Sequence, residues 1–296
     1  MRAFCAFRTL ASALLACALL FATAGCFGHG ERGSYGMPNG GLVRGASALD
    51  KSGPGYLLAR PTEPTRFGNA TLVGALTRAF ASVNARFPGT PRMRVGDLGE
   101  RWGGGHARHG SHRSGRDADV IFHATDAAGV PVPGSGFLAY DRLGVARAPV
   151  SSDAPAALAQ PLLFDAARNW HFVRTLLMDD ASLTQWIFCS RGVKAILLTY
   201  AIEHEPDPEA LMRAATVLHQ PSVGRAHDDH FHIRVLCSAQ ERATGCTDYG
   251  PVWPWLRDRV EQIGPGDPEE LDDRTLVRLL LEDLPQAPDT VALAGR

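Results

Sequence analysis

The chain has 296 residues, of which 45% are hydrophobic, and this length suits one sizeable globular domain with appendages better than two full cores. Its formal net charge of −1 gives no indication of a nucleic-acid partner or of binding to an anionic membrane surface. The binding partner of the protein must therefore be inferred from local sites rather than from its overall charge.

The first 25 residues have the pattern of a signal peptide. Arg2 and Arg8 precede an uncharged stretch, residues 9–24, that ends in small residues. This stretch is shorter than the roughly 20 apolar residues that a permanent membrane helix needs. Residues 1–25 are therefore predicted to direct export to the periplasm and then to be removed.

Cys26 follows two small residues, Ala24 and Gly25, and this short motif resembles a bacterial lipobox, in which the cysteine is lipidated. Thr23 stands where an aliphatic residue is commoner. Two interpretations stay open. One is a lipid tether to the membrane through Cys26, and the other is an ordinary cleavage site nearby with an incidental cysteine.

The cysteines that follow the leader predict one disulfide bond. Export to an oxidising compartment favours disulfides. The short loop between Cys237 and Cys246 makes these two residues the natural pair. Cys189 lies in the apolar run WIFC, so we expect it to be a small buried hydrophobic residue.

The chain is predicted to have three further parts after the leader. Residues 26–54 are rich in glycine and lack apolar periodicity up to about Leu49, so they are expected to form a tether and an irregular N-terminal segment. Residues 55–262 are expected to form the catalytic domain. Residues 263–296 are expected to form a peripheral acidic helix, at 267–284, and a tail.

Hydrophobic periodicity predicts helices and short strands that are interspersed along the catalytic domain. Helices are expected at 71–86, 164–178, 193–202 and 209–218, and strands at 93–95, 119–123, 185–189 and 231–237. No regular strand–helix repeat is present. The sequence therefore predicts an α+β fold, with a mainly antiparallel sheet and flanking helices.

The 11 histidines are unevenly distributed, and two clusters stand out. The first cluster is His106, His109 and His112, in a glycine-rich loop, and the second is His227, His230 and His232. Alternation along a strand would point His230 and His232 to one side and the intervening Phe231 toward the core.

A carboxylate pair follows the first cluster at the start of a predicted strand. Asp117 and Asp119 are two residues apart, so they are expected on the same face of that strand. Gly115 permits a tight reversal that would bring His112 back toward Asp119.

Two imidazoles and one carboxylate from these clusters are typical of a catalytic zinc site, because they leave the fourth position for water. Zinc lowers the pKa of such a water from about 16 toward about 7 and polarises a scissile carbonyl. A further histidine beside the ligands could carry a proton to the leaving amine. The simpler alternatives are surface histidines on glycine-rich loops or a purely structural ion site.

At these residues the sequence resembles the penicillin-insensitive murein endopeptidases. They belong to a larger group of zinc enzymes that includes lysostaphin-type peptidases, D-Ala-D-Ala dipeptidases and the hedgehog signalling domain. The resemblance extends from about Gly33 to Gly250 and includes the blocks GSYGMPNGGLVRG, FGNATLVGAL, RVGDL, HGSHRSGRDADVIF, FDAARNWHFVRTLL and HDDHFHIRVLC. It implies the zinc fold shared by hedgehog domains and D,D-peptidases.

The resemblance also implies roles for individual residues. It assigns Zn²⁺ to His112, Asp119 and His232, and makes His230 the general base or a stabiliser of the transition state. His109 is implied either as an additional or alternative metal contact or as a residue that contacts substrate or supports the metal ligands.

His227 matches another family histidine that lines the cleft. A catalytic or oxyanion-binding role is expected for it, and the alternative is a loop histidine held by Asp228 or Asp229. Asp117 is expected to support the ligands by accepting a hydrogen bond.

The expected function is therefore that of a penicillin-insensitive zinc metalloendopeptidase, acting on D-alanyl–diamino acid cross-links of peptidoglycan. Two alternatives stay open: a zinc D,D-carboxypeptidase or dipeptidase that acts on uncrosslinked stem peptides, and a zinc-stabilised module that binds the cell wall without catalysis.

Overall fold

The structure is a computed structural model, and it describes residues 32–134, 136–148 and 160–261. The predicted signal peptide, Cys26 and the helix expected at 267–284 lie outside these residues. The described chain from Gly33 onward belongs to one compact unit. Within it, none of the helices has the length and apolar character needed to cross a membrane.

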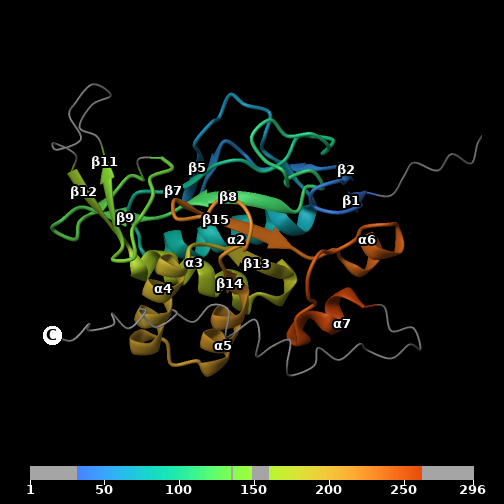
Figure 1. Cartoon of the computed structure of the whole chain (residues 1–296). Helices are drawn as coiled ribbons and strands as arrows, with labels where there is room; N and C mark the ends of the chain where they lie inside the picture. Colours follow the sequence, from blue (N-terminus) through green and yellow to red (C-terminus); the bar gives the residue numbers. More distant parts are fainter. Residues whose placement is uncertain (1–31, 135, 149–159, 262–296) are drawn as a thin grey trace, which may run out of the picture. The chain divides into compact units, whose positions relative to one another are not determined.

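A seven-stranded sheet positions the functional site (Figure 1). Its strands follow one another across the sheet as β14 (Leu218–His219), β13 (Thr184–Phe188), β15 (His230–Val235), β8 (Asp117–Ile121), β7 (Met93–Val95), β5 (Tyr56–Leu58) and β4 (Ser52–Gly53). The pairs β13–β14 and β5–β7 are parallel, and the other neighbouring pairs are antiparallel. The predicted α+β class with a mainly antiparallel sheet is confirmed.

Smaller antiparallel sheets accompany this central sheet. They are formed by β1 (Gly33–Tyr35) with β2 (Leu42–Arg44), by β3 (Ser47–Ala48) with β6 (Phe67–Gly68), and by β10 (Pro131–Val132), β9 (Ala124–Thr125), β12 (Gln160–Phe164) and β11 (Val145–Ala148) in that order. The expectation of irregular structure up to Leu49 is wrong for β1 and β2, where Ser34 and Val43 are buried. Strands of three residues are too short to show a detectable alternation of apolar and polar residues in the sequence.

Polar side chains cap the first turns of the four longest helices. The helices are α2 (Ala70–Arg86), α3 (Ala166–Met178), α4 (Arg191–His204), α5 (Pro208–Val217), α6 (Ala239–Ala243) and α7 (Arg257–Val260), with short 3₁₀ helices η2 (Asp180–Ser182) and η3 (Pro254–Leu256). The side chains of Asn69, Asp165, Ser190 and Asp207 accept hydrogen bonds from the first turns of α2, α3, α4 and α5. The four predicted helices are therefore confirmed, with shifts of one or two residues at their ends.

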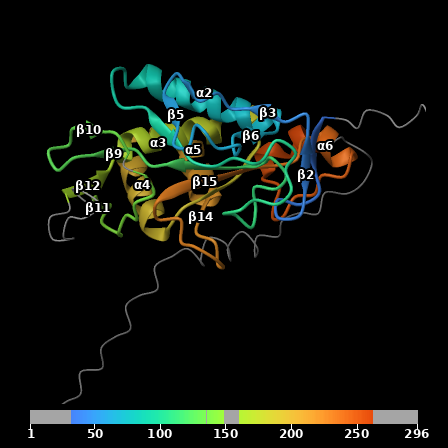
Figure 2. The same ribbon diagram turned by 90° about the horizontal axis from the view of Figure 1, so that it is seen from above.

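Helices α2 and α3 cover one face of the central sheet (Figure 2). Phe80 of α2 stacks on Phe172 of α3 at 5.3 Å between ring centroids, and Phe172 packs against Phe231 of β15 at 6.2 Å. Phe231 is fully buried, as expected. Because side chains alternate along a strand, the neighbouring His230 and His232 face the opposite side of the sheet.

The predicted disulfide between Cys237 and Cys246 is present, directly after β15. It closes the loop that contains α6. Arg116 and Asp248 form a buried ion pair beside this loop, and the backbone N–H of Cys237 donates to the Asp248 carboxylate. Cys189 is fully buried, in agreement with the sequence analysis.

Candidate metal centre

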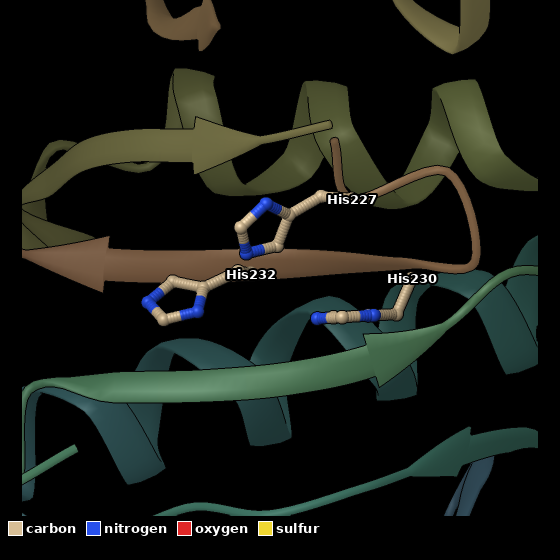
Figure 3. A group of neighbouring side chains, drawn as sticks. All are labelled: His227, His230 and His232. Carbon is tan, nitrogen blue, oxygen red and sulfur yellow. The ribbon is translucent and has the colours of Figure 1, made fainter. Parts of the chain in front are cut away.

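Strand pairing places the two sequence motifs side by side. In the antiparallel pair β8–β15, His232 lies opposite Asp119 and Arg234 lies opposite Asp117. Figure 3 shows His230 and His232 on the same side of β15, with His227 reaching toward them from the preceding loop. Residues more than a hundred positions apart thus share one surface of the sheet.

Two glycines allow the close packing around the segment from His112 to Asp119. Gly115 has a φ of +71°, and a Cβ there would lie 3.1 Å from the Val43 side chain. This left-handed residue forms the reversal that was expected to bring His112 back toward Asp119. Gly96 lies against Asp119, and a Cβ at this glycine would lie 3.2 Å from the Asp119 Cβ.

Three imidazole nitrogens surround one oxygen of Asp119. The Oδ1 atom lies 3.3 Å from Nε2 of His112, 3.2 Å from Nδ1 of His232 and 3.4 Å from Nε2 of His230. Asp119 and His112 are completely buried. Both Asp119 oxygens and Nε2 of His112 have no hydrogen-bond partner among the described residues.

The hydrogen bonds of two of these histidines determine which nitrogen carries a lone pair. Nδ1 of His112 lies 2.9 Å from the Leu98 carbonyl oxygen, to which it can only donate. Nε2 of His232 lies 2.8 Å from Oδ1 of Asp117, and a carboxylate likewise accepts. The other nitrogen of each ring therefore directs its lone pair toward Asp119.

This arrangement fits a metal ion. In the neutral imidazoles these lone pairs converge on a buried carboxylate and repel it, and either protons or a bound cation would remove that repulsion. Ligands about 2.0–2.1 Å from a tetrahedral zinc ion are roughly 3.3 Å apart, which matches the 3.2 and 3.3 Å separations around Asp119. Metal-bound histidines commonly donate their second N–H to a carboxylate or a backbone carbonyl, as both do here.

The electrostatics of the two aspartates favour cation binding. Burial opposes ionisation of both residues, but their positively charged and histidine neighbours outweigh it. Arg234 and His232 lower the pKa of Asp117, while His112 and His230 lower the pKa of Asp119 well below its usual value. Both carboxylates are therefore negatively charged at neutral pH.

His230 is held by a second carboxylate. Its Nδ1 donates to Oδ1 of Asp229, the preceding residue. Burial opposes protonation of His230, but Asp119 and Asp229 outweigh burial and raise its pKa to about 9. Asp229 thus orients an imidazole whose Nε2 atom points at the centre of the site.

His227 lies at the end of the loop before β15, in the left-handed conformation with a φ of 53°. Its Nδ1 atom donates to the Arg225 carbonyl oxygen at 2.9 Å, so neither Asp228 nor Asp229 holds its ring. Burial, His232 and His230 lower its pKa to about 4. His227 is therefore neutral near pH 7, and its Nε2 lone pair is available to substrate or metal.

His109 and His106 lie on the other side of Asp119. Nε2 of His109 is 3.0 Å from Oδ2 of Asp97 and 3.4 Å from Oδ2 of Asp119. His106 is buried, and its ring centroid is 4.7 Å from that of His109. Among the described residues, several groups of side chains have ligand atoms close enough together to hold a metal ion. These groups are His109 with His112 and Asp119; Asp97 with His106 and His109; and His227 with His230 and His232.

Two carboxylates of the site were not predicted as site residues: Asp97 was not expected there at all, and Asp229 was expected only as a partner of His227. Asp97 lies just after the end of β7, 22 positions before Asp119, and its carboxylate contacts His109. In the sequence, only its place in the RVGDL block pointed to it. Asp229 is adjacent to His230, yet adjacent side chains in a strand normally diverge. The local loop geometry brings these two together.

A cleft of about 930 Å³ opens over the cluster. At one end it is lined by Arg60 and Phe137, and at the other by Trp186, Phe188 and Tyr249. Arg60 follows β5 and Trp186 lies on β13, so the cleft extends across the sheet on either side of the β8–β15 pair. A long substrate can therefore occupy both sides of the histidine cluster.

Comparison with known proteins finds similarity to one family. The family model described as "Penicillin-insensitive murein endopeptidase" matches residues 34–132, which include His109, His112 and Asp119. The resemblance to this family is confirmed. A penicillin-insensitive murein endopeptidase of Haemophilus influenzae is 26% identical over 227 residues, covering 75% of this chain and 69% of the relative.

A second relative supports the same family over a shorter region. The penicillin-insensitive murein endopeptidase of Klebsiella pneumoniae subsp. pneumoniae is 36% identical over 96 residues, or 31% of this chain and 33% of that protein. The second histidine cluster lies beyond the stretch matched by the family model. Its connection to the first motif comes from the pairing of β8 with β15.

Proposed function

We propose that this chain is a zinc endopeptidase that hydrolyses the cross-link between D-alanine and the side-chain amine of the diamino acid in a neighbouring stem peptide of peptidoglycan. The observation that carries this proposal is the buried convergence of His112 Nε2 and His232 Nδ1 on Asp119. The family resemblance supports peptidoglycan as the substrate.

His112, Asp119 and His232 are the proposed ligands, and zinc is the proposed metal because imidazole and carboxylate donors in tetrahedral spacing suit it. When bound, zinc activates a water molecule and polarises the scissile carbonyl. Asp117 and the Leu98 carbonyl fix the orientation of the two imidazoles. Because Nε2 of His109 already contacts Asp97, we assign His109 to substrate contact or support of Asp119 rather than to the ligand set.

His230 is the proposed acid–base residue. Asp229 holds its ring with Nε2 directed at the centre of the site, where His230 could take a proton from the attacking water and deliver it to the leaving amine. His227, which is neutral, lies 5.1 Å from His230 and 5.3 Å from His232 between ring centroids. We propose that His227 contacts the substrate near the scissile carbonyl group.

The carboxypeptidase alternative differs in the shape of substrate that it needs. A stem-peptide terminus would occupy only one side of the metal, whereas a cross-link extends in both directions. The cleft reaches from Arg60 to Trp186 across the strands of the site, which favours the cross-link. A substrate in the cell wall also agrees with the predicted export to the periplasm.

The deciding experiment is digestion of purified murein with the full exported chain, followed by liquid chromatography and mass spectrometry. Cross-linked dimers should become monomers. Chelation of the metal should stop the reaction, and penicillin should leave it unchanged, because penicillin acylates a serine nucleophile and the proposed nucleophile is a water molecule. Asp119→Ala serves as the inactive, metal-free control.

Two results would redirect the proposal. Release of free D-alanine from uncrosslinked pentapeptides, with dimers untouched, would identify a carboxypeptidase. Binding to murein without any hydrolysis by the metal-loaded protein would identify a non-catalytic module.

A further inference from the structure

We propose that Arg234 binds a carboxylate of the substrate, next to the scissile amide on the side of the leaving amine. The inference rests on the proposed function and assigns a specificity-determining residue to it. Arg234 would recognise cross-links whose leaving amine sits on a carbon that also bears a carboxylate.

Arg234 is held rigidly beside the metal ligands. It lies two residues after His232 on β15, so both side chains are on the cleft face of the sheet. Its Nε donates to Oδ1 of Asp117 at 2.6 Å, the same oxygen that accepts from His232. Its guanidinium carbon lies 5.4 Å from the ring centroid of Phe188, in a cation–π contact.

The two terminal nitrogens of Arg234 have no hydrogen-bond partner in the part of the chain that the structure describes. Among the described residues, Nε supplies its only hydrogen bond, to Asp117. Arg234 nevertheless lines the cleft. A guanidinium with its Nε anchored and its outer edge facing a cleft is preorganised to bind a carboxylate through two parallel hydrogen bonds.

The other arginines of the cleft are less suited to this task. Arg60 and Arg108 both contact the Asp97 carboxylate, which also contacts His109, and Arg108 also contacts Glu63, so these two arginines lie on the His109 side of the site rather than beside His232. Arg225 lies on an exposed loop. Arg234 is therefore the cleft arginine that combines a fixed position with unused donors beside the metal ligands.

The chemistry of the cross-link supplies a matching anion. In a diamino dicarboxylic acid, the carbon that bears the leaving amine also bears a carboxylate, so the negative charge lies only a few bonds from the reacting carbonyl. A side chain anchored next to His232 can reach it while the carbonyl faces the zinc ligands. In a cross-link through a monocarboxylic diamino acid, no carboxylate lies at this position.

The test compares two synthetic cross-linked peptides that differ in one group. In the first peptide the carboxylate beside the scissile amide is free, and in the second it is a carboxamide. The zinc-loaded wild-type protein should cleave the acid at least about tenfold faster in kcat/KM than the amide, the effect expected from a charge-assisted hydrogen-bonded pair.

The substitution Arg234→Met should bring this acid-to-amide ratio close to one, and Arg234→Lys should keep part of it. Arg225→Met is the matched control, because it removes another cleft arginine, and it should keep the full ratio. Zinc content of each variant is measured in parallel. A purely structural role for Arg234 would slow both peptides equally and leave the ratio unchanged.

The outcomes separate this inference from the proposed function. If the wild type cleaves both peptides at equal rates, or if Arg234→Met keeps the preference, the role of Arg234 is refuted while the endopeptidase activity stands. If Arg225→Met rather than Arg234→Met abolishes the preference, the carboxylate lies elsewhere in the cleft. If the zinc-loaded wild type cleaves neither peptide, both proposals fail.

Discussion

Asp117→Asn should weaken zinc binding without unfolding the domain. The substitution keeps the size of the side chain but removes the charge on the oxygen that accepts from His232 Nε2 at 2.8 Å and from Arg234 Nε at 2.6 Å. Hydrogen bonds to charged groups contribute about 1.5–3 kcal/mol and neutral ones about 1 kcal/mol. If each of these two bonds is weakened by roughly 1 kcal/mol, the free energy of zinc binding should become less favourable by about 2 kcal/mol.

That energy corresponds to about a thirtyfold rise in the zinc dissociation constant, within the range of about 10 to 100-fold typical for residues that orient metal ligands. Competition against a chromogenic chelator measures this affinity directly. Asp97→Asn is the matched control, since Asp97 contacts His109 rather than a proposed ligand, and it should change the affinity less. Equal zinc affinities for wild type and Asp117→Asn would refute the view that Asp117 orients His232.

Three further predictions follow from other parts of the structure. His230→Ala should keep its zinc but turn over about a hundredfold or more slowly, and loss of zinc equal to that of His232→Ala would contradict the division between base and ligand. Removing the Cys237–Cys246 disulfide, whose partners are 9 residues apart, should cost about 3 kcal/mol and lower the melting temperature by roughly 5–10 °C; an unchanged thermal unfolding curve would count against this. Burial and Arg168 lower the pKa of His123 to about 3 from 6.5, so its contribution to stability is present above pH 6.5 and is lost as the pH falls toward 3. Between pH 6.5 and about 3, the unfolding free energy of His123→Asn should therefore fall less steeply with acid than that of the wild type. The slopes, measured by chemical denaturation at several pH values, should differ by about 1.4 kcal/mol per pH unit. Parallel curves for the two proteins would refute the buried neutral state of His123.

The helices were predictable because their signals are local. In α2 the apolar residues recur at helical spacing, and Asn69 caps the first turn. The mutual approach of His112 and Asp119 was also within reach, because Gly115 can adopt the positive φ that the reversal needs. Similarly, alternation in a strand was enough to place His230 and His232 on one face.

The N-terminal strands were missed for a physical reason. β1 and β2 have three residues each, and β1 is joined to the rest by contacts with Glu241, whose carboxylate accepts from the backbone N–H of Ser34. Glu241 is 207 positions away. No local pattern can carry a signal of that kind.

What the sequence by itself determined is therefore the kind of chemistry. Its two histidine motifs, the aspartate between them and the spacing of each predict a metal site, since residue types and strand alternation are local properties. Only the tertiary structure decided which groups support that site. Asp97, Asp229 and Arg234 take their roles from the register of β8 against β15 and from the loops around it, because long-range pairing determines which side chains meet.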